Sequence, residues 1–133
     1  MFTPRNYDSG KLVSMLQVAS ANTVAKGDAL AFSSGYVQRA TGTTTEVRYV
    51  AMQDQTTAGT ALTLLCLETA GVAFEADCTH NMAQSYVGTK VDLTDHGTLD
   101  NDSASTDYTF FIENIIGATT DKKCVGYFVQ KTT

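Results

Sequence analysis

Short apolar segments separated by polar, turn-forming residues make up most of this chain. Within these segments apolar residues either alternate with polar ones or run together, and Gly, Asn, Asp and Thr fill the gaps between them. Such spacing is typical of an all-β sandwich or barrel. The predicted strands are residues 12–19, 29–32, 36–39, 47–52, 61–68, 72–76, 86–93, 108–116 and 124–130. We therefore predict an all-β fold, a small β-barrel or β-sandwich.

The connections between the predicted strands are also informative. Residues 33–35 (SSG) predict a tight hairpin turn, because glycine readily supplies a positive φ. Helical periodicity is confined to a single predicted turn within residues 77–85. Residues 94–107 are polar, acidic and rich in turn formers, which predicts a long exposed loop or a short hairpin. No internal repeat is convincing.

The first eleven residues lack the periodicity of the rest and are predicted to form an extended N-terminal arm. We accordingly divide the chain into an arm, residues 1–11, and a single β-rich domain, residues 12–133. The arm holds the only proline, Pro4, together with Phe2, Arg5 and Tyr7. Either the parent domain or a neighbouring subunit could hold it, and these four residues are the candidate contact residues.

The amino-acid composition supports the predicted β fold and argues against two classes of partner, nucleic acids and membranes. The chain has 133 residues, of which 21 are threonine, a β-branched residue that suits a pleated sheet. Its formal net charge of −5 argues against a surface that follows a phosphate backbone, so no nucleic-acid partner is expected. No apolar run approaches the length of a membrane span, and residues 1–11 lack the apolar core of a signal peptide. We expect no membrane partner.

Residues with catalytic or metal-binding chemistry are few, and their spacing favours structural roles. The aspartates of residues 92–107 do not match a calcium-loop pattern, and turn chemistry explains them better; they are Asp92, Asp95, Asp100, Asp102 and Asp107. Two histidines, His80 and His96, fall in predicted loops without a paired nucleophile. Three widely spaced cysteines form no zinc or disulfide pattern, and Cys66 and Cys124 are predicted to be small buried residues. We expect no catalytic activity, cofactor or metal.

The order of glycines and strands in several segments resembles the capsid decoration, or cement, proteins of tailed bacteriophages. The segments are KGDALAFSSGYVQRAT (residues 26–41), EVRYVAMQD (46–54), GVAFEAD (71–77), VGTKVDLTDHGTLDN (87–101) and ENIIGATTDKKCVGYFV (113–129). This resemblance covers most of residues 26–130, and none of its motifs is catalytic.

The resemblance implies a structural virion protein that binds the outer surface of the assembled head and stabilises it. Its expected partners are the phage major capsid protein and neighbouring copies of itself, often as trimers, on the capsid exterior after assembly in the bacterial cytoplasm. By position, the arm residues Phe2, Pro4, Arg5 and Tyr7 would contact the capsid or a neighbouring copy. Deleting residues 1–11 should then leave a folded domain that no longer binds heads.

The alternative function is a β-rich binding module, such as a head-fibre base, a tail component or a binder of host-surface glycans. That function requires an exposed aromatic platform. The candidate residues are Tyr36, Tyr49, Tyr86, Tyr108 and Tyr127.

Overall fold

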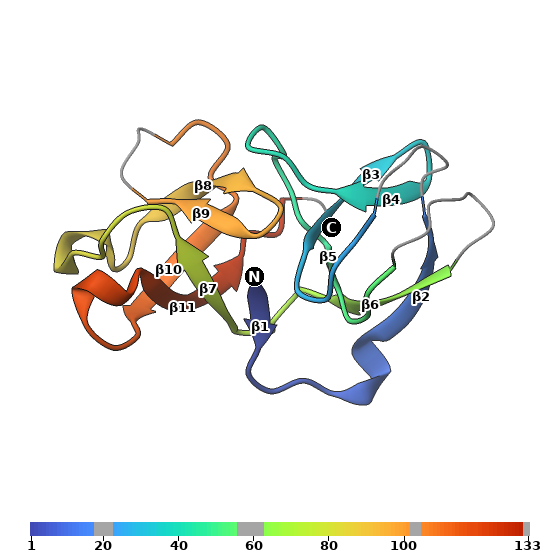
Figure 1. Cartoon of the computed structure of the whole chain (residues 1–133), viewed down its shortest axis with the longest axis horizontal. Helices are drawn as coiled ribbons and strands as arrows, with labels where there is room; N and C mark the ends of the chain where they lie inside the picture. The colour runs from blue at the N-terminus through green and yellow to red at the C-terminus, as the bar shows by residue number, and fades with distance from the viewer. Residues whose placement is uncertain (18–22, 56–62, 102–104, 132–133) are drawn as a thin grey trace.

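Two small β-sheets lie side by side in the computed structural model (Figure 1), which describes residues 1–17, 23–55, 63–101 and 105–131. The predicted all-β fold is confirmed, since the helical segments of the described residues are single 3-10 turns at Ser9–Lys11, Gln84–Tyr86 and Thr119–Asp121. The strands are β1 (Phe2–Pro4), β2 (Leu12–Leu16), β3 (Ala29–Ser33), β4 (Tyr36–Arg39), β5 (Tyr49–Ala51), β6 (Thr63–Glu68), β7 (Phe74–Cys78), β8 (Lys90–Asp95), β9 (Thr98–Asp100), β10 (Phe110–Ile115) and β11 (Lys123–Phe128).

The strands from β7 to β11 form a closed five-stranded barrel. Their order around the barrel is β7-β11-β10-β8-β9, and each neighbouring pair in that order is antiparallel. A short parallel pairing between β7 and β9 closes the ring, with Cys78 opposite Leu99. Closure removes most of the free strand edges that an open sheet would expose.

The strands from β2 to β6 form the second sheet, in the order β2-β6-β5-β3-β4. Its neighbouring strands are also antiparallel. A single parallel bridge between Gln17, just after β2, and Val37 in β4 joins the first and last strands. The second sheet is therefore also curled into a ring, which one bridge closes.

The two rings repeat the same topology and register, although the sequence shows no convincing repeat. Strands β2 to β6 correspond, in the same order, to strands β7 to β11. Both rings close by parallel pairing, near β2 and β4 in one ring and between β7 and β9 in the other. In the β2–β6 ring, Leu30 pairs with Tyr49. In the β7–β11 barrel, Val91 pairs with Phe110, and these two residues lie 61 positions after Leu30 and Tyr49 respectively. The chain is thus an internal structural duplication, with corresponding residues 60 to 62 positions apart: 61 for Tyr49 and Phe110, 60 for Glu68 and Phe128, and 62 for Val37 and Leu99.

The two halves share glycine residues at corresponding positions. Gly27 and Gly88 precede the first strand of each hairpin and have φ values of 93° and 85°, a region in which a side chain is strained. The hairpin turns contain Gly35 and Gly97. Apolar positions elsewhere are filled by different residues, because a core accepts many apolar side chains of suitable volume.

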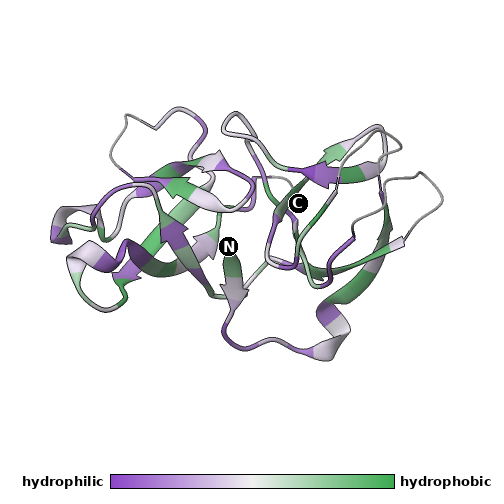
Figure 2. Cartoon of the chain, in the orientation of Figure 1, coloured by the Kyte–Doolittle hydropathy of each residue, from purple (hydrophilic) through white to green (hydrophobic). Residues whose placement is uncertain are grey.

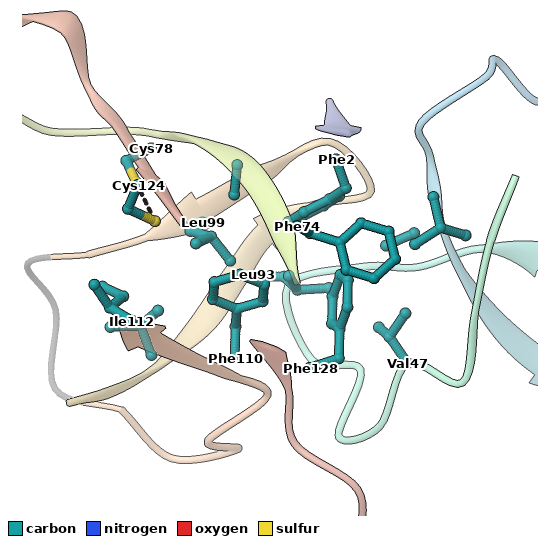
Figure 3. Close-up of a cluster of buried hydrophobic side chains, with 14 of the residues drawn as sticks. Phe2, Val47, Phe74, Cys78, Leu93, Leu99, Phe110, Ile112, Cys124 and Phe128 are labelled. Atoms are coloured by element: carbon teal, nitrogen blue, oxygen red, sulfur yellow. Dashed lines mark hydrogen bonds between the residues drawn. The ribbon is translucent and has the colours of Figure 1, made fainter. Parts of the chain in front are cut away.

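The main hydrophobic core joins the two rings. Four phenylalanine rings, Phe2, Phe74, Phe110 and Phe128, pack with centroid separations between 4.9 and 6.0 Å (Figure 3). Val47, from the loop before β5, belongs to the same cluster. Apolar and polar residues alternate along β7, β8 and β9 (Figure 2), as expected for strands with one buried face, whereas β2 and β6 are mostly apolar. Rings that share one core cannot separate without exposing it to water.

Most predicted strands are confirmed, with different limits at some ends. The hairpin β3–β4 is confirmed, and its turn residues Ser34 and Gly35 both have positive φ. The predicted helical turn in residues 77–85 is wrong at its start, because Asp77 and Cys78 complete β7. Within residues 94–107, the hairpin alternative is confirmed by β8 and β9. No described helix is long and apolar enough to cross a membrane.

Candidate interaction surfaces

Phe2, the first predicted contact residue, is fully buried in the chain's own core. Its strand, β1, pairs antiparallel with β7, and Phe2 lies opposite Ala76. The Phe2 ring packs 4.9 Å from the ring of Phe128. Of the two alternatives for what holds the arm, the structure shows the parent domain at Phe2–Pro4, because β1 pairs with β7 and burial of the aromatic side chain stabilises this contact. Phe2 is not available to contact a partner in this conformation.

The other predicted contact residues become more exposed along the segment. Pro4 is half-buried opposite Phe74. The Arg5 backbone N–H donates to the Ala73 carbonyl, while its exposed guanidinium lies 3.5 Å from the carboxylate of Glu75. Tyr7 is 42% exposed. Of the four predicted contact residues, Arg5 and Tyr7 present their side chains to solvent.

A second surface feature is an open pocket of about 380 Å³ beside β3 and β4. Its lining includes the threonines of residues 43–45 together with Phe32, Gln38 and Arg48. The Phe32 side chain is 49% exposed, and its ring meets the Tyr49 ring edge to face at 5.6 Å. The pocket combines an apolar ring with hydroxyl, amide and guanidinium groups.

The tyrosines that we considered as an aromatic platform do not form one cluster. Tyr108 is 50% exposed, whereas Tyr36, Tyr49, Tyr86 and Tyr127 are half-buried. The exposed aromatic residue beside Tyr49 is Phe32, which the sequence did not distinguish from a core residue because it lies in an apolar strand. In place of the predicted tyrosine platform, the described residues present an aromatic pair formed by Phe32 and Tyr49.

Within the acidic segment, Asp95 shows the predicted turn chemistry, whereas Asp92 binds the backbone of a loop 14 to 16 residues further along the chain. The Asp92 carboxylate accepts hydrogen bonds from the backbone N–H groups of Thr106, Asp107 and Tyr108 at 2.8–3.0 Å. Burial opposes ionisation of Asp92, but these bonds outweigh it and lower the pKa of the carboxyl group. The Asp95 carboxylate accepts from the Gly97 N–H.

No described residues gather into a cluster of three or more His, Cys, Asp or Glu side chains that could hold a metal ion. Asp102, one of the aspartates considered for calcium, lies outside the described residues. Asp92, the best-connected of the described aspartates, directs its carboxylate at backbone donors.

The two histidines occupy different structural settings. The His80 backbone N–H donates to the side-chain oxygen of the buried Asn101. His96, in the β8–β9 turn, places its Nδ1 atom 3.1 Å from the Asp28 carboxylate.

Asp28 is the residue that sequence analysis missed. It is 6% exposed, and its carboxylate accepts from the Arg39 guanidinium and the Ala25 backbone N–H, both at 2.9 Å, as well as contacting His96. The Ala29 N–H also donates to the His96 carbonyl. Asp28 therefore ties the β3–β4 hairpin of one ring to the β8–β9 turn of the other. The K-G-D sequence at residues 26–28 marked the position without indicating this role.

All three cysteines are buried, which confirms the prediction for Cys66 and Cys124. Burial raises the pKa of Cys66 to about 12. The Sγ atoms of Cys78 and Cys124 lie 3.7 Å apart. The hydrogen bond between the two thiols lowers the pKa of Cys78, whereas the same bond and burial raise the pKa of Cys124. These thiols fill the core of the β7–β11 barrel (Figure 3).

Comparison with known proteins identifies no relative: no family model, no curated protein and no solved structure matches the chain.

Proposed function

We propose that this chain is a structural virion protein that binds the outer surface of a bacteriophage capsid lattice and stabilises the assembled head. One observation carries the proposal. Two of the segments that resemble capsid decoration proteins, residues 26–41 and 87–101, form the corresponding hairpins β3–β4 and β8–β9 of the duplicated fold. The resemblance thus follows the repeated unit of the architecture.

The settings of the reactive side chains also support a structural role. Asp28 and Asp92 direct their carboxylates at guanidinium or backbone donors, and the thiols of Cys66, Cys78 and Cys124 are buried. A protein present in many copies stabilises a lattice by multivalency, so each individual contact can be modest. The proposed partners remain the major capsid protein and neighbouring copies, including trimers, on the virion exterior.

The exposed end of the first segment is the proposed contact with the capsid. Arg5 and Tyr7 follow β1 directly, so they are presented from a fixed point beside β7. Tyrosine and arginine are enriched at the centres of protein interfaces. Deletion of residues 1–11 would also remove Phe2 from the core, so loss of binding in that deletion would not separate contact from folding.

Surface substitutions test the contact without disturbing the core. In a sedimentation assay with purified undecorated heads, Arg5→Ala with Tyr7→Ala should weaken binding at least about tenfold, because truncating an interface anchor commonly costs more than 1 kcal/mol. Tyr108→Ala, which alters an equally exposed tyrosine elsewhere, should bind as the wild type does. Equal binding by all variants would contradict the contact assignment while leaving capsid binding intact.

Quantitative mass spectrometry of purified particles tests the function itself. A lattice component should be found in a simple ratio to the major capsid protein. A few copies per particle would indicate a tail or vertex component instead. Absence from the particles would contradict the virion proposal.

The aromatic pocket favours glycan binding as the second candidate function. An exposed ring beside hydroxyl, amide and guanidinium groups can stack on a sugar face and bind its hydroxyls. In the pocket lined by the threonines of residues 43–45, Phe32 provides the ring and Gln38 provides the amide. A glycan array should show binding that Phe32→Ser abolishes; no binding to any glycan by the wild-type protein would eliminate this alternative.

A further inference from the structure

The duplication reveals a strand edge that is covered in one ring and uncovered in its counterpart. In the β7–β11 barrel, β1 pairs with β7 along the part of its edge that β9 does not reach. The counterpart of β7 in the other ring is β2. Among the described residues, the pairings on that edge of β2 begin only after the strand, at the bridge between Gln17 and Val37. Along β2 itself, no described residue is paired by backbone hydrogen bonds on this side, although β4 lies beside the strand.

The backbone of Ser14 faces this open edge. Its opposite residue in β6, Leu65, directs its carbonyl to the Met52 N–H and its own N–H to the Gln53 side chain, both on the β5 side. Antiparallel strands alternate the direction of their hydrogen-bonding groups, so Ser14 must direct its N–H and C=O away from β6. Glu75, the counterpart of Ser14 in β7, lies opposite Thr3 of β1.

The sequence of β2 lacks the features that normally protect an open edge. Its residues, LVSML, include no charge and no proline, and its pairing with β6 shows no bulge. The Leu16 side chain is 44% exposed. β2 is mostly hydrophobic (Figure 2) and lies on the side of its ring away from the β7–β11 barrel (Figure 1). An apolar, uncharged open edge of this kind is typical of a strand that pairs with another chain.

We propose that β2 pairs antiparallel with β2 of a second copy of this chain, forming a two-fold symmetric dimer. The symmetry axis passes through Ser14, so Ser14 faces its own equivalent across the interface. Leu12 then lies opposite Leu16 on the outer face, and Val13 lies opposite Met15 on the inner face. This register covers the exposed Leu16 side chain on both copies and satisfies the backbone groups of Ser14.

The segment that covers the corresponding edge inside the chain has the same pattern as β2. In β1, the hydroxyl residue Thr3 stands between the apolar residues Phe2 and Pro4. In β2, the hydroxyl residue Ser14 stands between Val13 and Met15. A second β2 therefore offers the kind of strand that the duplicated fold already accepts at this position. Because the two contacting surfaces are identical, the pairing closes at two copies.

The dimer does not depend on the proposed capsid function, and its test uses the isolated full chain. Sedimentation equilibrium over a wide concentration range should show a monomer–dimer equilibrium for the wild type. Leu16→Lys should weaken dimerisation by about a hundredfold or more, since each dimer loses two buried leucines. Tyr108→Lys changes a similarly exposed aromatic residue in the other ring, and it should dimerise like the wild type.

Hydrogen exchange locates the interface independently of any substitution. The Ser14 amide should become protected as the concentration of the wild-type protein rises, and this protection should be lost in Leu16→Lys. Far-UV circular dichroism should confirm that both variants remain folded, which the exposure of their side chains favours. A wild type that stays monomeric or forms only trimers, or a Leu16→Lys variant that dimerises normally, would overturn the proposal.

Discussion

At the scale of single residues, Phe2 connects the start of the chain to the centre of the fold. Its ring contacts Phe110 and Phe128 and is fully buried. Phe2→Ala should therefore lower the free energy of unfolding by about 3 to 5 kcal/mol, the usual cost of removing a buried aromatic ring. Urea denaturation measures this change.

Tyr7→Ala is the matched control for Phe2→Ala, because it truncates an exposed aromatic residue of the same segment. Its effect on the free energy of unfolding should stay within about 0.5 kcal/mol, as for most surface substitutions. If Phe2→Ala were as mild as Tyr7→Ala, β1 would not contribute to the core.

The role of Phe2 could not be predicted from the sequence. A three-residue strand, Phe2–Pro4, is too short to show alternation, and its partner strand β7 lies far along the chain. The burial of Cys66 and Cys124, by contrast, followed directly from their apolar surroundings. The sequence identifies a core residue only where the neighbouring residues in the same segment are apolar or alternate between apolar and polar.

At the scale of elements, the Asp92 carboxylate in β8 fixes the loop that leads into β10. It accepts three backbone hydrogen bonds from that loop. Asp92→Asn should therefore lower the free energy of unfolding by about 1 to 3 kcal/mol at neutral pH. Asp100→Asn, in the adjacent β9, is the control, because no hydrogen bond to its carboxylate is found among the described residues.

The pH dependence of the Asp92 effect has a definite sign. Burial raises the pKa of Asp92, but the hydrogen bonds from the loop outweigh it, so the folded-state pKa lies below the unfolded value. Stability from this carboxylate is complete above the unfolded pKa of about 3.9 and is lost as pH falls through the lower folded value. Denaturation curves of wild type and Asp92→Asn should converge at acidic pH; a constant difference would contradict this assignment.

Element predictions from the sequence succeeded where the turn residues were decisive. Hairpin β3–β4 was located because Ser34 and Gly35 form a two-residue turn between apolar segments. The start of the helical turn within residues 77–85 was predicted incorrectly because Asp77 is a typical helix N-cap residue, whereas pairing with β11 and β9 extends β7 through Cys78. Long-range pairing overrode a weak local preference.

At the scale of the whole molecule, Asp28 couples the two rings. Its nearly buried carboxylate contacts Arg39 and His96, which belong to different rings. Asp28→Asn removes the charge and should lower the free energy of unfolding by about 3 kcal/mol, because the nearly buried Asp28 carboxylate loses its ion pair with Arg39 and its charged contact with His96. Asp54→Asn, whose carboxylate is exposed and accepts from the Lys26 N–H, should cost much less.

Hydrogen exchange should place the effect of Asp28→Asn at the junction. Amides of the β8–β9 turn should lose protection although the substitution lies in the other ring. Loss of protection confined to the β3–β4 hairpin would show that the rings are held together by the phenylalanine core alone.

The duplication itself was not predictable from one sequence. The halves share strand order and register, but their inward-facing residues differ: Tyr49 and Glu68 correspond to Phe110 and Phe128. The two halves of the sequence therefore share glycines at their turns but have different residues at corresponding core positions. For function, the sequence provided the resemblance to capsid decoration proteins, and the exposed residues Arg5 and Tyr7 make that proposal testable.

The repeated topology also bears on the ancestry of the chain. A single ring of about 60 residues buries only about 60% of the surface that its unfolded chain exposes, less than a larger domain does, and is marginal as an independent domain. Two half-length polypeptides placed side by side would bury the phenylalanine cluster between them, as the two rings do now. Fusion of two copies of one short gene would make that association permanent, with the segment around Gly71 as the join. Each half could then diverge, one covering the edge of β7 with β1 and the other retaining the edge of β2 for the proposed dimer.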